Sequence, residues 1–192
     1  MCGRYYIEID TSELEDMCRQ VEQNTVNEAE QLTFNMKSGE VFPTNIVPIR
    51  VGDGVYKPMK WGFTAYDGKL LINARSETAI QKPTFKKSML ERRCLIPASG
   101  YYEWQKQGTS KQKYSIYLPD KKPIYMAGCY REEKESSLSS FVILTKAASP
   151  SLRGIHDRMP VIIPEDRIHS WLYDSPDVMN ESLNDLLFEP AV

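Results

Sequence analysis

The sequence of 192 residues lacks the features that mark membrane, secreted and metal-binding proteins. No segment approaches the run of about 20 apolar residues that a transmembrane helix requires, and the N-terminus has no apolar signal segment. The four cysteines are scattered without a C-x-x-C pair, which predicts neither a disulfide framework nor a zinc site; they are Cys2, Cys18, Cys94 and Cys129. We therefore expect a cytoplasmic protein with free thiols, no metal, no cofactor and no membrane contact.

Histidine is scarcer still, since His156 and His169 are the only two in the chain. Few side chains are therefore available for proton transfer near neutral pH. His156 lies in a polar segment between apolar strands, and such loops often carry site residues. His169 shortly precedes Trp171 in a helical pattern, which favours a packing or capping role for it.

Charge is unevenly distributed along the chain, although the net charge is only −2. Residues 8–40 carry nine acids and two bases, residues 41–164 carry ten acids and twenty bases, and residues 165–192 carry seven acids and one base. A basic middle segment is compatible with a polyanion such as nucleic acid, but a solvated basic face has the same pattern. Charge alone therefore leaves the partner open.

Short segments rich in β-forming residues recur along the chain, and helical patterns separate some of them. Strands are predicted over 3–9, 45–51, 55–61, 70–73, 94–97, 101–105, 113–118, 124–130, 141–145 and 161–163. Helices are predicted over 12–23, 84–93, 165–173 and 181–188, with Cys18 on the apolar face of the first. The pattern predicts an α+β protein, a single domain over 1–192, with a curved, barrel-like sheet of mixed or antiparallel strands.

Cys2 occupies the most unusual position in the sequence. Removal of Met1 would leave a residue that carries both a free α-amine and a thiol. The amine has a pKa of about 7.7–8.0 and the thiol one of about 8.5, so both can act as nucleophiles near neutral pH. Such a 1,2-aminothiol condenses with an aldehyde, first to an imine and then to a five-membered thiazolidine. The alternative is that Cys2 simply begins the first strand.

Two further segments could carry chemistry. Glu103 lies among aromatic residues on a predicted strand, where burial would raise its carboxyl pKa and suit it to acid–base catalysis; an outward-facing Glu would have no such role. Asn73 and Arg75 lie two residues apart at the end of another strand, so they point to the same side if extended. An amide can orient a substrate and a guanidinium matches phosphate oxygens, but a simple strand-to-helix junction gives the same pattern.

Seven motifs resemble, in order, those of the SRAP family, the SOS response-associated peptidase-like proteins that attach covalently to abasic sites in single-stranded DNA. They are MCGRY at 1–5, PTNIVP at 43–48, WG at 61–62, INARSET at 72–78, RCLIPASGYYEW at 93–104, MAG at 126–128 and IHDRMP at 155–160. The resemblance covers nearly the whole chain. It implies the SRAP fold and single-stranded DNA with abasic sites as the partner, without a cofactor. Nothing in the sequence suggests more than a monomer, although the oligomeric state stays open.

The resemblance also implies a role for each matching residue. Cys2 would form the thiazolidine with the ring-opened sugar aldehyde, and Asn73 would position the terminal amine. Glu103 would assist sugar ring opening and the self-processing removal of Met1, and His156 would transfer protons at the sugar oxygen. The implied DNA contacts are Arg4, Arg75, Trp104 and Arg158. An associated lyase activity at the abasic site is left open.

The segment 63–69 departs from the family pattern. Family members usually carry a longer stretch between the Trp-Gly and Asn-Ala-Arg motifs, often with an Ile-Pro and another Trp. Here the stretch is short and its tip is polar. The shortening affects the part expected to wedge against DNA, so a preference for strand ends or junctions stays open, whereas the four implied catalytic residues are unaffected.

Two other functions are compatible with the residues. A cysteine peptidase acting on other proteins would use Cys2, His156 and Asn73 as nucleophile, base and orienting amide, but it would not need its nucleophile at the chain terminus. A non-covalent single-strand binding module would depend on basic residues alone. These would be Arg4, Arg75, Lys86, Lys87, Arg92 and Arg93.

Overall fold

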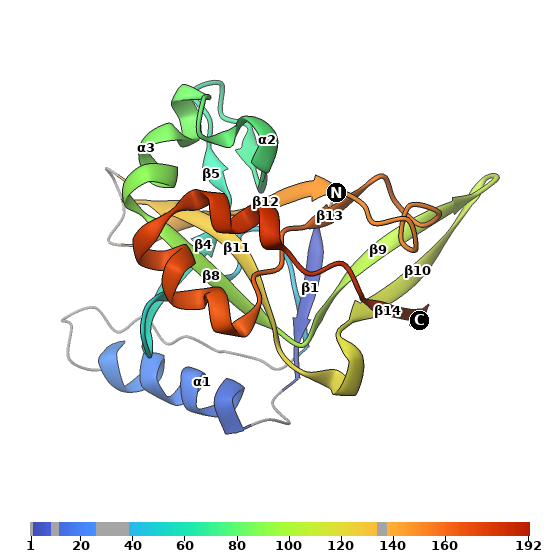
Figure 1. Ribbon diagram of the computed structural model, residues 1–192, viewed down its shortest axis with the longest axis horizontal. Coiled ribbons are helices and arrows are strands. Elements are labelled where there is room, and N and C mark those ends of the chain that lie inside the picture. Colours follow the sequence, from blue (N-terminus) through green and yellow to red (C-terminus); the bar gives the residue numbers. More distant parts are fainter. Residues whose placement is uncertain (1, 9–11, 26–38, 134–137) are drawn as a thin grey trace.

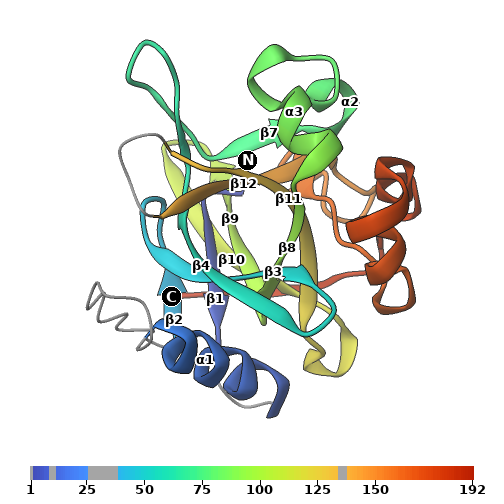
Figure 2. The same cartoon turned by 90° about the vertical axis from the view of Figure 1, so that its left-hand side faces the viewer.

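A closed barrel forms the centre of the molecule (Figure 2). The computed structural model describes residues 2–8, 12–25, 39–133 and 138–192. The barrel strands are β3 (Ile46–Gly52), β4 (Val55–Trp61), β8 (Arg93–Ala98), β11 (Ile124–Arg131) and β12 (Ser139–Ala147). They follow the order β11-β8-β3-β4-β12, and β12 pairs again with β11 to close the ring. Only the β12–β4 pair of this ring is parallel, which confirms the expected barrel-like mixed sheet in an α+β fold.

A second sheet, antiparallel throughout, shares its core with the barrel (Figure 1). Its order is β14-β10-β9-β1-β2, and its strands are β1 (Arg4–Ile7), β2 (Gly39–Val41), β9 (Gly100–Gln107), β10 (Ser110–Tyr117) and β14 (Leu187–Pro190). Side chains alternate between the two faces of a sheet. Tyr5, Tyr101 and Glu103 are therefore buried on the inner face, whereas Arg4 and Trp104 lie on the outer face. The β9–β10 hairpin projects from the body (Figure 1).

Two short strands flank the C-terminal half of β12. β7 (Asn73–Arg75) pairs with it in parallel on one side, and β13 (Arg158–Pro160) pairs with it antiparallel on the other. Thr145 is the register partner of both Arg75 and Pro160. Two motifs that are more than eighty residues apart in the sequence therefore lie on adjacent strands. A hairpin of β5 (Phe63–Thr64) and β6 (Leu70–Leu71) precedes β7.

Helices and single helical turns cover the barrel (Figure 2). α1 (Ser12–Thr25) buries Leu14, Met17 and Val21 beside β3 and β4, and Cys18 packs at the edge of the same core, as predicted. The other helical elements are α2 (Ser76–Ala79), α3 (Pro83–Glu91) and the turns Pro119–Lys121, Glu165–Arg167, Ser170–Asp174 and Pro176–Glu181. Among the described residues, no helix is both long and apolar enough to span a bilayer.

Arg93 does not have the DNA-binding role that the non-covalent single-strand binding module would give it. Its side chain is buried, and its guanidinium donates hydrogen bonds to carbonyl oxygens of Met89, Trp171 and Leu172. These carbonyls lie at the C-terminal end of α3 and in the helical turn Ser170–Asp174, where the backbone leaves acceptors without intrahelical partners. Arg93 therefore joins two helical segments to the barrel and is not available to DNA.

The C-terminal segment also differs from the prediction. The helix expected over 181–188 is absent: residues 182–186 form neither helix nor strand, and Leu187–Pro190 forms β14 against the edge of β10. The edge of β10 offers backbone donors and acceptors, and pairing with β14 satisfies them. The strand expected over 161–163 lies earlier, at β13, although Ile162 keeps a bridge to Met126.

Candidate active site

The carboxamide of Asn73 holds the N-terminal segment in place. Its Nδ2 donates a hydrogen bond to the Cys2 carbonyl oxygen over 2.8 Å, although the two residues are 71 positions apart. Asn73 begins β7, and its pairing with Ile143 of β12 sets its depth beside the barrel. Cys2 is fully buried, and its Sγ lies 3.8 Å from the Arg4 carbonyl oxygen. The structure therefore brings together two of the residues that the sequence singled out.

Glu103 is buried on the inner face of β9 with only 3% of its surface exposed. Burial raises the pKa of its carboxyl group, and the positive charge of a protonated His156 acts in the opposite direction. Burial also raises the pKa of the Cys2 thiol, and a negative charge on Glu103 raises it further. The Glu103 carboxyl therefore interacts electrostatically with both Cys2 and His156. In its protonated form this carboxyl can act as an acid.

His156 lies in the loop between β12 and β13. Gln105 Nε2 of β9 donates to the Gly154 carbonyl oxygen over 2.9 Å and so fixes this loop beside the sheet. The Arg158 backbone N–H donates to Nδ1 of the neutral imidazole over 3.0 Å, which leaves the ring proton on Nε2. In the protonated ring, Nδ1–H faces the Asp157 carboxylate at 2.8 Å. Both protonation states of His156 thus have a partner, as a proton-transferring residue requires.

Glu103 and His156 open into the same groove. The groove has a volume of about 550 Å³ and is also lined by Trp104, Lys106, Lys111 and Arg153. Two of these cations belong to the projecting β9–β10 hairpin, and Arg153 belongs to the loop that carries His156. A groove with three cationic side chains that leads to a buried carboxyl and an imidazole suits an anionic substrate with a reactive group at one point.

The four residues implied as DNA contacts have different surroundings. Arg4 forms an ion pair with Glu40 at 2.8 Å, and its guanidinium lies 3.8 Å from the centroid of the exposed Phe42 ring and 5.3 Å from that of Trp104. Arg75 is exposed at the end of β7. Arg158 instead makes a bidentate ion pair with Glu77, at 2.6 and 2.8 Å, which braces the start of β13 against α2. Its guanidinium is already engaged within the protein.

Other residues of the site escaped the sequence analysis. Tyr5 and Tyr101 are buried beside Cys2, and Lys113 shares the Glu40 carboxylate with Arg4. Alternation along each strand would place Tyr101 on the same face as Glu103. Only the pairing of β1 with β9 shows that Tyr5 lies directly opposite Tyr101, and a single sequence does not contain that pairing.

The cysteines and the second histidine lie outside or beside the groove without forming a further cluster of ligands in the described residues. The four cysteines are free thiols, as expected. His169 lies apart from the groove, where its Nδ1 is 2.8 Å from the Asp53 carboxylate and its ring packs on Tyr173. Within the described parts of the chain, no group of three His, Cys, Asp or Glu side chains could hold a metal ion.

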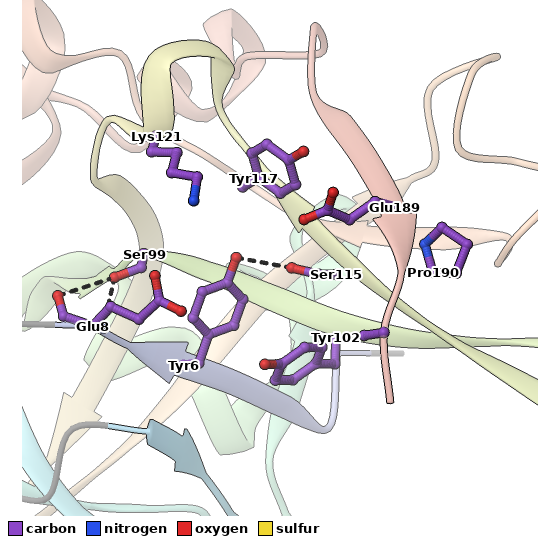
Figure 3. Close-up of a pocket in the computed structure, with 10 residues that line it drawn as sticks. Tyr6, Glu8, Ser99, Tyr102, Ser115, Tyr117, Lys121, Glu189 and Pro190 are labelled. Atoms are coloured by element: carbon purple, nitrogen blue, oxygen red, sulfur yellow. Dashed lines mark hydrogen bonds between the residues drawn. The ribbon is translucent and has the colours of Figure 1, made fainter.

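A second pocket, of about 230 Å³, lies on the outer face of the second sheet (Figure 3). Tyr6 lies at its centre, and its hydroxyl is 2.9 Å from Ser115 Oγ. Burial raises the pKa of Tyr6 to about 12, so the phenol stays neutral. The pocket lining contains none of the four predicted catalytic residues. The groove beside Glu103 is therefore the candidate active site.

Comparisons with known proteins show the family of this chain. The family model described as "SOS response associated peptidase (SRAP)" matches residues 1–191. "Abasic site processing protein YoaM" of Bacillus subtilis is 32% identical over 95% of this chain and 85% of the relative. "Abasic site processing protein YedK" of Escherichia coli is 37% identical over 60% of this chain, and the match spans 54% of that relative.

The fold also matches solved structures. A crystal structure of a protein from Bacteroides thetaiotaomicron aligns with a TM-score of 0.77 at 22% identity, covering 98% of this chain and 91% of that chain. A protein from Bordetella bronchiseptica aligns with a TM-score of 0.75 at 20% identity over the full length of both chains. At such low identity the likeness establishes a common fold.

Proposed function

Because the chain belongs to the SOS response associated peptidase family, we propose that it captures abasic sites in single-stranded DNA as a covalent crosslink to Cys2. Relatives that match most of this chain are named for abasic site processing. The observation that carries the proposal is the hydrogen bond from Asn73 to the Cys2 carbonyl oxygen, beside a buried Glu103. It holds the terminal residue where its amine and thiol can meet one carbon atom.

The proposed chemistry begins once Met1 has been removed. The Cys2 amine attacks the aldehyde carbon of the ring-opened sugar, and loss of one water gives an imine. The thiol then adds across the C=N bond: sulfur bonds to the carbon, and the thiol proton ends on nitrogen. Amine, thiol and aldehyde thereby give a thiazolidine and one water, and no external oxidant or reductant is needed.

Each site residue has a distinct role in this scheme. Asn73 orients Cys2 through the carbonyl oxygen. Glu103, whose carboxyl pKa burial raises, donates in its protonated form the proton that opens the sugar ring and helps expel water; in its ionised form it can activate water for the self-processing removal of Met1. His156 exchanges protons with the sugar oxygen at the mouth of the groove. An associated lyase step would use the same imine.

The DNA strand would follow the cationic groove and the outer face of the second sheet. Lys106, Lys111 and Arg153 would contact phosphates on one side of the lesion, and Arg4 and Arg75 on the other. Trp104 lines the groove, where an unpaired base can stack on its ring. Arg158 would join these contacts only by exchanging the Glu77 carboxylate for a phosphate.

This path predicts a salt-dependent contribution from the hairpin lysines. Replacing Lys106 and Lys111 with Gln should weaken binding to intact single-stranded DNA and reduce the slope of log K against log salt by about 1.4, since each phosphate contact on a single strand contributes about 0.7. Fluorescence anisotropy across a salt series measures this slope. The matched control replaces Lys57 and Lys60, exposed lysines of β4 that do not line the groove. Equal slopes for both variants would contradict the proposed path.

The covalent function is tested by intact mass under denaturing conditions. Protein that has lost Met1 should form a one-to-one adduct with an abasic single-stranded oligonucleotide, with the loss of one water. Cys2→Ala should form no stable adduct, and a protein extended before Cys2 should form none either, because its α-amine is blocked. If the extended protein forms the same adduct, the terminal-amine mechanism is wrong; if the processed protein forms none, the covalent function is wrong.

The same samples separate the two alternative functions. A cysteine peptidase acting on other proteins would keep its activity in the extended protein, because a thiol nucleophile does not require a free amine. A non-covalent binding module would bind intact and abasic DNA equally well and would tolerate Cys2→Ala. Either pattern, found without an adduct, would replace the proposed function.

A further inference from the structure

Two tyrosine hydroxyl groups are buried next to Cys2 and have no hydrogen-bond partner among the residues that the structure describes. Tyr5 is 0% exposed and Tyr101 is 1% exposed. They are direct partners across β1 and β9, so both side chains point from the same face of the sheet into the core that contains Cys2. Both side chains thus belong to the same buried cluster as the proposed nucleophile.

Unpartnered buried hydroxyls are costly to retain. A buried polar group without a partner costs about 1–3 kcal/mol, and such groups are rare enough in folded proteins that each one calls for a reason. Phenylalanine would fill nearly the same volume at both positions and leave no unpartnered oxygen. By contrast, Tyr6, on the opposite face of the same strand, has its hydroxyl within 2.9 Å of Ser115 Oγ. We therefore infer that the two inner hydroxyls gain a hydrogen-bond acceptor during the reaction.

The sulfur of Cys2 requires hydrogen-bond donors when it reacts. In the structure, Sγ lies 3.8 Å from the Arg4 carbonyl oxygen, which can accept from a thiol but cannot stabilise a thiolate. Burial and the nearby Glu103 both raise the pKa of this thiol. Attack on the imine nevertheless requires negative charge to develop on sulfur. In a buried site, hydrogen-bond donors aimed at the sulfur can supply that stabilisation.

We propose that the hydroxyl groups of Tyr5 and Tyr101 donate hydrogen bonds to Cys2 Sγ as it adds to the imine, which makes both tyrosines catalytic residues of ring closure. This inference rests on the covalent function proposed above. No proton leaves either phenol, because the thiol proton passes to the imine nitrogen. Burial raises the pKa of both phenols well above its usual range, and a negative charge at Cys2 raises it further, so both remain donors at neutral pH.

The test separates the two chemical steps. Borohydride reduces an imine to a stable amine but leaves a thiazolidine unchanged, so quenching a reaction at successive times and measuring intact masses gives both species. Tyr5→Phe and Tyr101→Phe should form the imine at the wild-type rate, whereas ring closure should slow roughly 10- to 100-fold for each, the effect expected when one hydrogen bond to a charged group is lost. The reducible imine should therefore accumulate in both variants.

The matched control is Tyr6→Phe, which removes a hydroxyl from the same strand but on the outer face. Its ring-closure rate should equal that of the wild type. Thermal unfolding supplies a second readout: the two inner Phe variants should melt at or above the wild-type temperature, because each loses an unpartnered buried oxygen. A structural role would instead lower the melting temperature and slow both steps.

Three outcomes would overturn the inference. Unchanged ring closure in both inner variants would show that the hydroxyls do not act on sulfur, while wild-type adduct formation would leave the covalent function intact. Loss of both steps together with a lowered melting temperature would assign the tyrosines to the fold. Absence of any adduct in the wild type would overturn the covalent function, and with it the role of the two phenols.

Discussion

Glu103→Gln is expected to slow crosslink formation by about 10²–10⁴-fold, the usual contribution of a positioned acid or base. The amide keeps the size of the side chain but cannot donate a carboxyl proton to the sugar oxygen. Time courses with an abasic oligonucleotide, read on denaturing gels, measure the loss. Removal of Met1 should slow as well if the same carboxylate activates water, and intact mass of the purified variant reports it.

The pH dependence follows from the raised pKa of Glu103. The acid form is the active one in ring opening, so the crosslinking rate should fall as pH rises through that pKa, and Glu103→Gln should remove this limb of the profile. Folding stability should also decrease as pH rises. A carboxyl whose pKa is raised by folding stabilises the fold below its unfolded pKa, and this contribution is lost as pH rises through the folded pKa. At neutral pH, Glu103→Gln should therefore raise the melting temperature.

The control for this variant is Glu189→Gln, which changes an exposed carboxylate on β14 at the outer pocket. It should leave both the rate and the melting temperature near the wild-type values. A Glu103→Gln protein that crosslinks at the wild-type rate would remove this residue from the mechanism. A lower melting temperature at neutral pH would show instead that the ionised carboxylate stabilises the fold.

Asn73→Ala should have the second largest effect, a loss of about 10²-fold in crosslinking rate, which is the cost of misplacing a reacting group by about 1 Å. Without Nδ2, the Cys2 carbonyl oxygen loses the hydrogen bond that connects the terminal segment to β7. Affinity for intact single-stranded DNA should stay the same, because Asn73 contributes no charge to the groove. Single-turnover rates and anisotropy, measured on the same samples, separate the two effects.

Asn73→Asp is the sharper variant, because it preserves shape and reverses the hydrogen-bonding character. A carboxylate at this position accepts hydrogen bonds only, so it faces the Cys2 carbonyl oxygen with no donor. It should therefore crosslink no faster than Asn73→Ala. If Asn73→Asp retained wild-type activity, orientation of Cys2 by the amide would be ruled out, whereas the roles of Glu103 and of the thiol would be unaffected.

Much of this arrangement could be predicted from local sequence. The strand expected over 55–61 coincides with β4, and the predicted strands 94–97, 101–105 and 124–130 lie within β8, β9 and β11. Alternation and residue type are local properties, so they are readable along a single chain. The unusual position of Cys2 and the placement of Glu103 among aromatic residues drew attention to the site in the same way.

Other features depended on contacts between distant segments. The C-terminal residues 187–190 form a strand because β10 offers them an unpaired edge, although their local pattern favoured a helix. The sequence suggests that Arg93 is a surface cation. In the structure it is buried, and its guanidinium donates hydrogen bonds to carbonyl groups of two helical segments. In both cases the tertiary partner outweighs the local preference, since a hydrogen bond to a remote segment leaves no periodicity in the sequence.

The sequence by itself determined the class of fold and singled out Cys2, Asn73, Glu103 and His156 as the residues of the proposed site. Tertiary structure alone decided how they meet: β7 brings Asn73 to Cys2, β12 carries β7 and β13 on its two sides, and β1 sets Tyr5 against Tyr101. The physical reason is that side-chain chemistry is a property of each residue, whereas strand register is a property of pairs far apart in the chain.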